Sequence, residues 1–287
     1  MTVRKILKRL PLSTPKLAAT PSQALRRVVS KDGLGVYASA DNLFKGAVFG
    51  RDSLEVAEDL MLIRPRLVRK IMLTLASLQG EENNPENEEE PGKIVHEYRR
   101  TVVDGKPLDK ESARIFKELS RHWGGTATEL TYYGSVDSTP HFIRVLGKYT
   151  QRYGQEIMHR RVTLRSGHQL SVTLVLENAI DWLITQLENS KSGLLEFERK
   201  NPHGIENQVW KDSKEFYTHE NGKLANHSRP IASIEVQALV YDALICGAQL
   251  LPSHRQTLLG LAKNTRDKTL KLLWREDKKY FALGLDY

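Results

Sequence analysis

Residues 52–79 decide the predicted fold and read DSLEVAEDLMLIRPRLVRKIMLTLASLQ. In the first half, Leu54, Ala57 and Leu60 fall on one helical stripe, which Pro65 ends. In the second half, after the proline, four apolar residues recur at steps of four, four and three. Two amphipathic segments separated by a proline predict two helices packed as an antiparallel hairpin.

The same helical spacing recurs along most of the chain, whereas strict alternation of apolar and polar residues is rare and brief. We expect the first helix to begin at Asp52 or Ser53, with Glu55 placed as in a capping box. Further helices are expected near residues 109–121, 139–153, 171–190, 231–251 and 255–275. The spacing therefore predicts an all-α protein built from helical pairs.

The composition is that of a soluble globular protein, with 40% hydrophobic and 27% charged residues among 287. No apolar run approaches the roughly eighteen residues that a membrane-spanning helix needs. Cys246 is the only cysteine and falls on an apolar helical stripe, so it is expected to be a buried small hydrophobe. With no disulfide framework and no recognisable secretory signal, the expected location is the cytoplasm.

The net charge of +8 is concentrated at the start of the chain, because residues 1–30 hold seven basic residues and no acidic one. This segment also lacks aromatic residues, which argues against a nucleic-acid footprint. We expect residues 1–30 to be a basic, flexible or linking lead-in and residues 31–287 to form the folded domain. Residues 81–92 contain six glutamates without the spacing of metal ligands, and are expected to be a solvated connector.

Two neighbouring motifs carry the chemistry: NQVWKDS at residues 207–213 and PIASIEVQ at residues 230–237. They place an aromatic residue and a carboxylate among amides, and a second carboxylate at the start of an expected helix. Glycoside hydrolysis uses one carboxyl group to protonate the leaving oxygen and a second to activate water or attack the sugar. The motifs therefore favour a sugar-cleaving site.

Together with GLLEF at residues 193–197, these motifs resemble the bacterial amylo-α-1,6-glucosidase, or glycogen debranching enzyme-like, family. Three further blocks are similar to that family's motifs and lie in the same order: FGRDS (49–53), GKIVHEYR (92–99) and YYGSVDSTP (132–140). The resemblance covers residues 22–287. It implies an (α/α)6 toroid of six helical hairpins, with the active site at one mouth.

A complete toroid of this kind has twelve helices, and the spacing here predicts seven or eight. We therefore expect the chain to hold an incomplete toroid. Compared with the family, it is expected to lack an N-terminal β-rich domain and the C-terminal hairpins that carry the catalytic base.

The resemblance also implies a role for each matching residue. Asp212 is implied to be the general acid, which must be neutral before it donates its proton. Arg51 and Asp52 are implied to hold sugar hydroxyls, and Asp137 to present a carboxylate at the mouth of a helix. The other residues implied to contact substrate are His96, Glu97, Tyr133, Trp210 and Glu235.

Each of these roles has a structural alternative. The three aspartates are also suited to capping a helix or a turn. Trp210 equally suits a core anchor, His96 a structural position, and Glu235 a solvated helix face. The pair His96-Glu97 does not extend to a zinc motif, because Arg100 stands where the second histidine would be. We expect no metal and no cofactor.

The resemblance thus implies an inverting glycoside hydrolase of α-linked glucans, acting most simply at 1,6 branch points, with the base not identifiable in this chain. The expected partner is an α-glucan or oligosaccharide, with neither nucleic acid nor a membrane, and with a second polypeptide or self-association completing the barrel. Two alternatives remain open: a catalytically incomplete carbohydrate-binding subunit or fragment, and a related glycosidase acting on a small, trehalose-like disaccharide.

Overall fold

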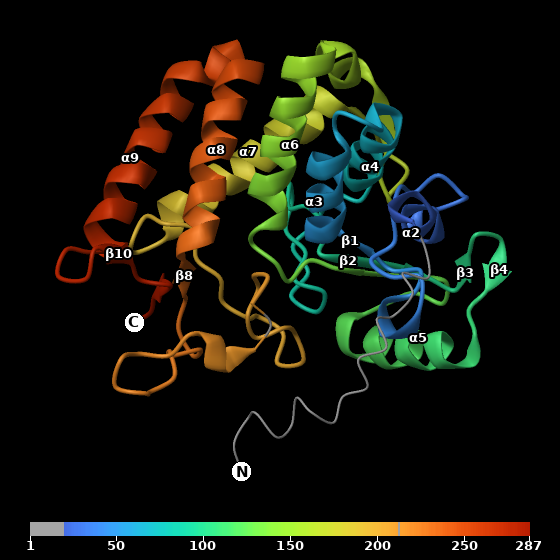
Figure 1. The fold of residues 1–287 in the computed structure, drawn as a ribbon, viewed down its shortest axis with the longest axis horizontal. Coiled ribbons are helices and arrows are strands. Elements are labelled where there is room, and N and C mark those ends of the chain that lie inside the picture. The colour runs from blue at the N-terminus through green and yellow to red at the C-terminus, as the bar shows by residue number, and fades with distance from the viewer. Residues whose placement is uncertain (1–19, 212) are drawn as a thin grey trace.

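The computed structural model describes residues 20–211 and 213–287. Figure 1 shows the arrangement of the elements in this part of the chain. The α-helices are α2 (Pro21–Val28), α3 (Gly50–Leu60), α4 (Pro65–Ser77), α5 (Lys110–Trp123), α6 (Ser138–Tyr153), α7 (Val172–Asn189), α8 (Ile234–Leu250) and α9 (Arg255–Leu273). Short 3-10 turns are η2 (Asn42–Phe44), η3 (Gln155–His159), η4 (Lys214–Phe216) and η5 (Pro252–His254).

The described residues also form eleven short strands, eight of them before α9 and three after it. They are β1 (Val48–Phe49), β2 (Glu97–Arg100), β3 (Val102–Val103), β4 (Lys106–Pro107), β5 (Glu129–Tyr132), β6 (Arg161–Thr163), β7 (Gln169–Ser171), β8 (Ala232–Ser233), β9 (Trp274–Arg275), β10 (Tyr280–Phe281) and β11 (Gly284–Leu285).

The seven helices that the spacing predicts are confirmed, but the all-α toroid is wrong. The structure is 48% helical, with 14% strand in several small sheets. The strands are two to four residues long, too short to show alternation in the sequence. They also pair segments that are far apart along the chain, so no local pattern announces them.

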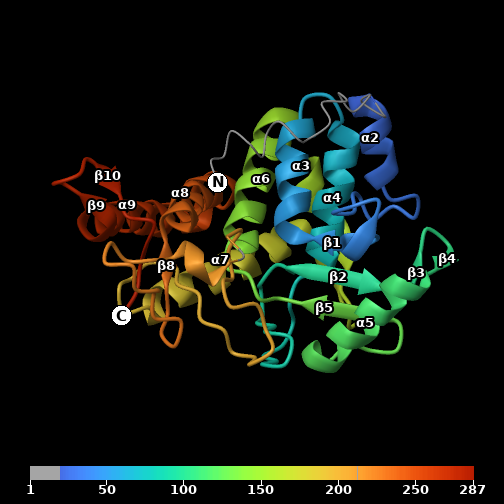
Figure 2. The same ribbon diagram turned by 60° about the horizontal axis from the view of Figure 1, so that its bottom comes forward.

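The largest sheet joins three of these segments in the antiparallel order β1-β2-β5. Val48 pairs with Tyr98, and Glu97 pairs with Tyr132 on the other side. Figure 2 shows the sheet between α5 and the helices α3 and α4. The sheet fixes where α3 begins, because the Gly50 amide donates to the carbonyl oxygen of His96 over 2.9 Å. A Cβ at Gly50 would lie 2.1 Å from the Val95 carbonyl oxygen, so only glycine fits there.

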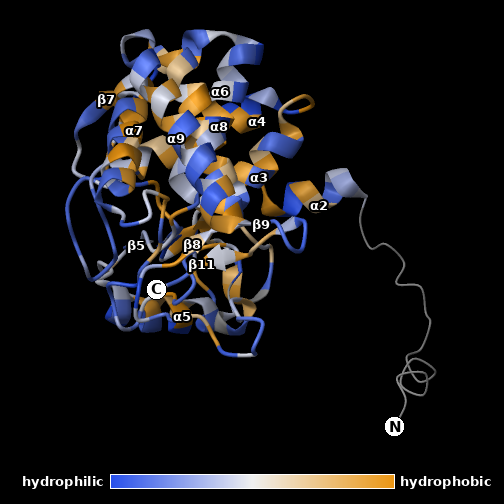
Figure 3. Ribbon diagram, turned by 90° about the vertical axis from the view of Figure 1, so that its left-hand side faces the viewer, coloured by the Kyte–Doolittle hydropathy of each residue, from blue (hydrophilic) through white to orange (hydrophobic). Residues whose placement is uncertain are grey.

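The helices α3, α6, α8 and α9 lie side by side, with α7 behind α6 in the view of Figure 1. Apolar side chains from all five helices form one core, to which α9 contributes Leu258 and Ala262. Figure 3 shows α7 as largely apolar. Helices α6 and α8 approach closely at Gly147, where a Cβ would lie 2.6 Å from the Cys246 Cβ. Cys246 itself is half-buried, and burial raises the pKa of its thiol.

No single helix in the described chain is long and apolar enough to cross a membrane. Helix α8 and the segment from Pro252 to Leu273 pass that test only as a pair, across a bend of 119°.

The glutamate-rich segment 81–92 is not the solvated connector that its composition predicts, because Glu88, Glu89 and Glu90 are buried. The Glu89 carboxylate forms an ion pair with Arg165 at 2.6 Å. The Glu90 carboxylate accepts hydrogen bonds from the Lys200 ammonium at 2.6 Å and the Trp182 indole at 2.9 Å. The partners of these carboxylates lie far along the chain, so the sequence alone shows charges without their counterparts.

Candidate functional site

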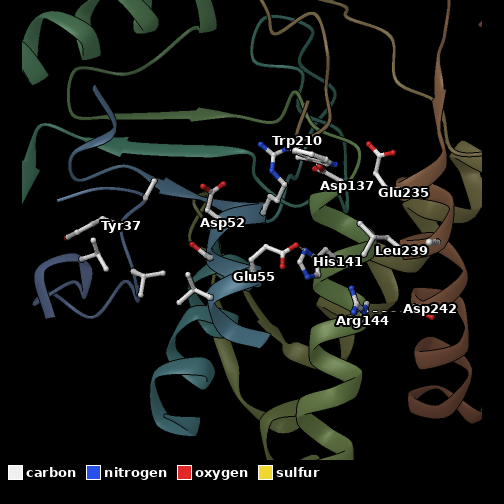
Figure 4. A pocket seen from close by; sticks show the side chains of 17 residues that line it. Tyr37, Asp52, Glu55, Asp137, His141, Arg144, Trp210, Glu235, Leu239 and Asp242 are labelled. Carbon is white, nitrogen blue, oxygen red and sulfur yellow. Dashed lines mark hydrogen bonds and ion pairs between the residues drawn. The ribbon is translucent and has the colours of Figure 1, made fainter. Parts of the chain in front are cut away.

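One cavity of about 920 Å³ lies where three helices begin. Helix α3 contributes residues of its first two turns, and α8 contributes residues between Glu235 and Asp242. Helix α6 contributes His141 and Arg144, together with Asp137 just before it. Figure 4 shows how the side chains from these elements face one another. The lining residues are Val28, Val36, Tyr37, Ala38, Arg51, Asp52, Ser53, Glu55, Val56, Asp137, His141, Arg144, Trp210, Glu235, Ala238, Leu239 and Asp242.

The three helix N-termini favour negative charge in the cavity, because the partial positive charges of their exposed amides point toward it. Asp52 and Glu235 lie in the first turns of α3 and α8, and Asp137 takes the cap position of α6. Helix α3 begins at Gly50 without a side-chain cap, so the prediction that Asp52 or Ser53 starts it is wrong. The Asp52 carboxylate is therefore not spent on capping.

Asp137 stands at a cap position but does not cap its helix. Its Oδ2 forms an ion pair with the Arg51 guanidinium at 2.9 Å, and its side chain is only 4% exposed. Its Oδ1 is buried and has no hydrogen-bonding partner in the described chain. Burying an acceptor without a partner costs about 1–3 kcal/mol in lost solvation. A hydrogen bond donated by a ligand hydroxyl would recover this free energy. The geometry therefore suits recognition of a hydroxyl group.

Glu235 is held in a similar way by a buried lysine. The Lys211 ammonium forms an ion pair with Glu235 Oε1, and the Lys211 side chain is 5% exposed. The Tyr217 hydroxyl also donates to Oε1, over 3.4 Å. Burial raises the pKa of Tyr217, and the nearby Glu235 and Asp137 carboxylates raise it further. Glu235 Oε2 is buried without a hydrogen-bonding partner in the described residues, so Glu235 is not a solvated face residue.

Trp210 stands at the wall of the cavity with 55% of its surface exposed. The Lys211 ammonium lies 4.5 Å from the centroid of its ring, a cation–π contact that holds the indole in place. This exposure excludes the alternative of a core anchor. A fixed, exposed indole is suited to cover the apolar C–H face of a sugar.

Deeper in the cavity, α3 and α6 form a cluster of charges that the motifs did not indicate. The Glu58 carboxylate lies 3.5 Å from His141 Nε2 and 3.2 Å from the Arg144 guanidinium. Burial alone would raise the pKa of Glu58, but His141, Arg144 and Lys148 outweigh it and lower the pKa to about 2. Arg144 also reaches Asp242 of α8 at 3.3 Å. This cluster joins the three helices, and its members His141, Arg144 and Asp242 line the cavity.

Three of the expected contact residues do not line the cavity; they are buried next to residues that do. Burial, together with the charges of Arg51 and Lys93, lowers the pKa of His96 to about 3, so its ring is neutral at physiological pH. Glu97 is ion-paired with Arg99, while burial raises the pKa of its carboxyl. Tyr133 is fully buried and donates its hydroxyl hydrogen to the Leu78 carbonyl oxygen over 2.9 Å.

These placements make His96, Glu97 and Tyr133 structural supports of the cavity wall in this conformation. The backbone of His96 sets the start of α3, and Glu97 pairs with Phe49 just before it.

Asp212, the expected general acid, lies outside the described residues. Its two neighbours in the chain are held by one buried amide. Asn207 Nδ2 donates to the carbonyl oxygens of Lys211 over 2.9 Å and Ser213 over 2.7 Å. His227 Nε2 lies 2.8 Å from Asn207 Oδ1 and orients that amide.

The structure brings five of the predicted site residues to one cavity: Arg51, Asp52, Asp137, Trp210 and Glu235. The motifs did not indicate the lining residues that lie one or two turns further along the same helices. His141 and Arg144 lie four and seven residues after Asp137, and Asp242 lies seven residues after Glu235. The same face of a helix repeats at these steps, so periodicity counted from each motif residue would have found them. The missed residues are Glu55, His141, Arg144 and Asp242.

No group of three or more histidine, cysteine or carboxylate side chains within residues 20–211 and 213–287 is placed to hold a metal ion. No protein-family model matches the sequence, and no curated protein matches it. The assignment to a family therefore stays a prediction made from the motifs.

Proposed function

We propose that the cavity binds a neutral sugar and that the protein is a glycoside hydrolase of α-linked glucans, acting most simply at 1,6 branch points. One observation carries the proposal. Asp137 and Glu235 each have one oxygen fixed by a cation and one buried oxygen without a described partner, in the same cavity as the exposed Trp210. Fixed acceptors for hydroxyls beside an aromatic platform are what a pyranose ring requires.

The negative charge of the cavity favours a neutral ligand over an anionic one. Five carboxylates line it, against two guanidinium groups, and Arg51 and Arg144 are both already engaged by carboxylates. Such an excess of negative charge repels phosphorylated or other anionic ligands. A neutral oligosaccharide, rather than a sugar phosphate, fits this balance.

The ion pairs also bear on which residue donates the proton. The Arg51 guanidinium contacts Asp137 and the Lys211 ammonium contacts Glu235, so both carboxyl groups are held in fixed orientations and are suited to accept hydrogen bonds from a ligand. A general acid has to be protonated before the reaction. We assign that role to Asp212, and assign Asp137 and Glu235 to substrate binding.

A second function, sugar binding without hydrolysis, is favoured by the same ion pairs. If Asp137 and Glu235 serve only as acceptors, the described part of the cavity holds binding groups and no identified proton donor. A related hydrolase acting on a trehalose-like disaccharide would use the same binding groups.

The test is to incubate the purified protein with a branched dextrin, isomaltose and trehalose, and to follow free glucose while measuring binding by calorimetry. Release of glucose from the branched dextrin supports the proposal, and release from trehalose alone supports the small-glycoside alternative. Binding without release leaves the protein a carbohydrate-binding module. Absence of both binding and release overturns the assignment of the cavity to sugars.

A further inference from the structure

A second hollow lies between α2 and the start of α4, and its charge is opposite to that of the carboxylate-rich cavity. It has a volume of about 620 Å³, and five basic side chains line it: Arg26, Lys31, Arg64, Arg66 and Lys70. No carboxylate is among its lining residues, and none of the five basic side chains forms an ion pair within the described chain. We call this hollow the basic groove. A face with this much unopposed positive charge attracts anions.

The carboxylates near the groove are already bound elsewhere. Asp32, next to Lys31, forms an ion pair with Arg100. Asp104 accepts hydrogen bonds from the Lys31 backbone amide over 2.8 Å and the Tyr37 hydroxyl over 2.9 Å. Neither carboxylate forms an ion pair with a side chain of the groove.

Two exposed apolar residues stand next to these cations. Leu62 and Ile63 form the turn between α3 and α4, and they are 64% and 69% exposed. Arg64 and Arg66 follow directly. Figures 2 and 3 both place this turn and α2 at the same edge of the molecule, and Figure 3 shows the turn as apolar. Exposed aliphatic side chains beside a cluster of cations are the combination by which proteins bind at a membrane interface.

We propose that this edge of the protein, formed by the basic groove and the Leu62–Ile63 turn, docks on an anionic phospholipid surface. The aliphatic pair enters the boundary between headgroups and acyl chains, while the five cations contact lipid phosphates and carboxylates. The floor of the groove is aliphatic, with Leu25, Val29 and Leu67, and contains no aromatic ring on which a nucleic-acid base could stack. A lipid surface therefore fits better than a nucleic acid.

The proposal revises the expectation that the protein has no membrane partner, which rested on the absence of a spanning segment. Docking on a surface needs no such segment. It also agrees with the charge of the sequence, because the seven basic residues of positions 1–30 belong to the same end of the chain as α2.

The experiment is co-sedimentation of the full chain with vesicles of phosphatidylcholine alone, or with about one third phosphatidylserine. We expect binding to the anionic vesicles only, weakening as salt is raised. Reversing three charges, in Arg64→Glu, Arg66→Glu and Lys70→Glu together, should lower the partition constant at least about a hundredfold, since each cation contributes about fivefold. Replacing both Leu62 and Ile63 by serine should lower it about tenfold.

Matched controls lie on α9, which carries exposed residues of the same kinds. Lys263→Glu with Lys271→Glu, and Leu270→Ser, should leave vesicle binding unchanged, because these residues are exposed but lie outside the groove. Because residues 1–19 are themselves basic, vesicle binding that survives equally in the groove and α9 variants overturns the proposal. Equal binding to neutral and anionic vesicles also overturns the proposal. The same holds if the groove variant loses binding to duplex DNA but keeps its binding to vesicles.

Discussion

The sugar-type cavity and the basic groove use charge in opposite ways. At the cavity, two basic groups are held by carboxylates from other elements: Arg51 by Asp137, and Lys211, beside the wall, by Glu235. In the groove, the basic groups are exposed and form no ion pair within the described residues.

This difference separates two kinds of recognition. Buried ion pairs fix the direction of each polar atom, which suits a small ligand with hydroxyl groups in set positions. Exposed, unopposed cations act over a Debye length and tolerate many orientations, which suits an extended charged surface. The predictions below test the two halves of this comparison, from the largest expected effect to the smallest.

The largest effect is expected for Asp212→Asn. It should lower hydrolysis of a branched dextrin about a thousandfold while leaving binding nearly unchanged, because the amide cannot donate the proton but keeps the shape. Glucosyl fluoride, whose leaving group needs little protonation, should recover much of the rate. Asp181→Asn, an exposed aspartate on α7, serves as the control. Undiminished dextrin hydrolysis would remove Asp212 from the mechanism.

The site could be predicted from the sequence as far as its residues lie at the starts of helices. Asp137 and Glu235 were found because a motif and a helix start coincide. Lys211 was not, because nothing in the sequence shows that a lysine next to an exposed tryptophan is buried against a carboxylate 24 residues away. Ion pairs between distant segments are a property of the packing, and their partners cannot be read from spacing.

The fold was predicted correctly for the long helices and incorrectly for their assembly. Helical periodicity is local, so α6 and α8 could be predicted to within three residues at each end. The pairing of β1 with β2 joins residues about fifty positions apart through two residue pairs. Strands this short carry no periodic signal, and the toroid that the resemblance implied has no place for this sheet.

The second prediction concerns the buried pair at the wall of the cavity. Lys211→Met should lower the free energy of unfolding by about 2–3 kcal/mol, because it leaves the partly buried Glu235 carboxylate without its cation. The double variant Lys211→Met with Glu235→Gln should recover part of this loss, because it removes both charges. Urea denaturation measures both. A double variant less stable than the single one would show that the pair is not the source of the effect.

Trp210→Ala tests the aromatic platform. Because the indole is 55% exposed, its removal should change the stability of the protein little. Loss of its contact with a sugar ring should weaken the binding of malto-oligosaccharides about tenfold, as measured by calorimetry. Tyr280→Ala, at a ring that is 49% exposed but outside the cavity, is the control and should leave binding unchanged.

Glu58 makes the stability of the fold depend on pH, in a direction set by the pKa of its carboxyl group. The folded protein holds this pKa at about 2, below the ordinary value of 4.5. The carboxylate therefore stabilises the fold above about pH 5, and this contribution is lost as the pH falls toward 2. Glu58→Gln should be less stable than the wild type by about 1–2 kcal/mol at pH 7, allowing for partial exposure, and nearly equal to it at pH 2. The exposed control Glu118→Gln should differ little from wild type at either pH.

The smallest effect is expected in the groove, where Arg66→Ala should change the free energy of unfolding by less than about 0.5 kcal/mol. Its side chain is exposed and forms no ion pair in the described part of the chain, so its removal breaks no contact of the fold. The matched variant Arg51→Ala should cost about 2 kcal/mol, because it leaves the buried Asp137 carboxylate without this cation. Urea midpoints of the two variants compare the groove and the cavity directly. Equal losses would mean that Arg66 is engaged by the fold, and would remove the distinction between the two sites.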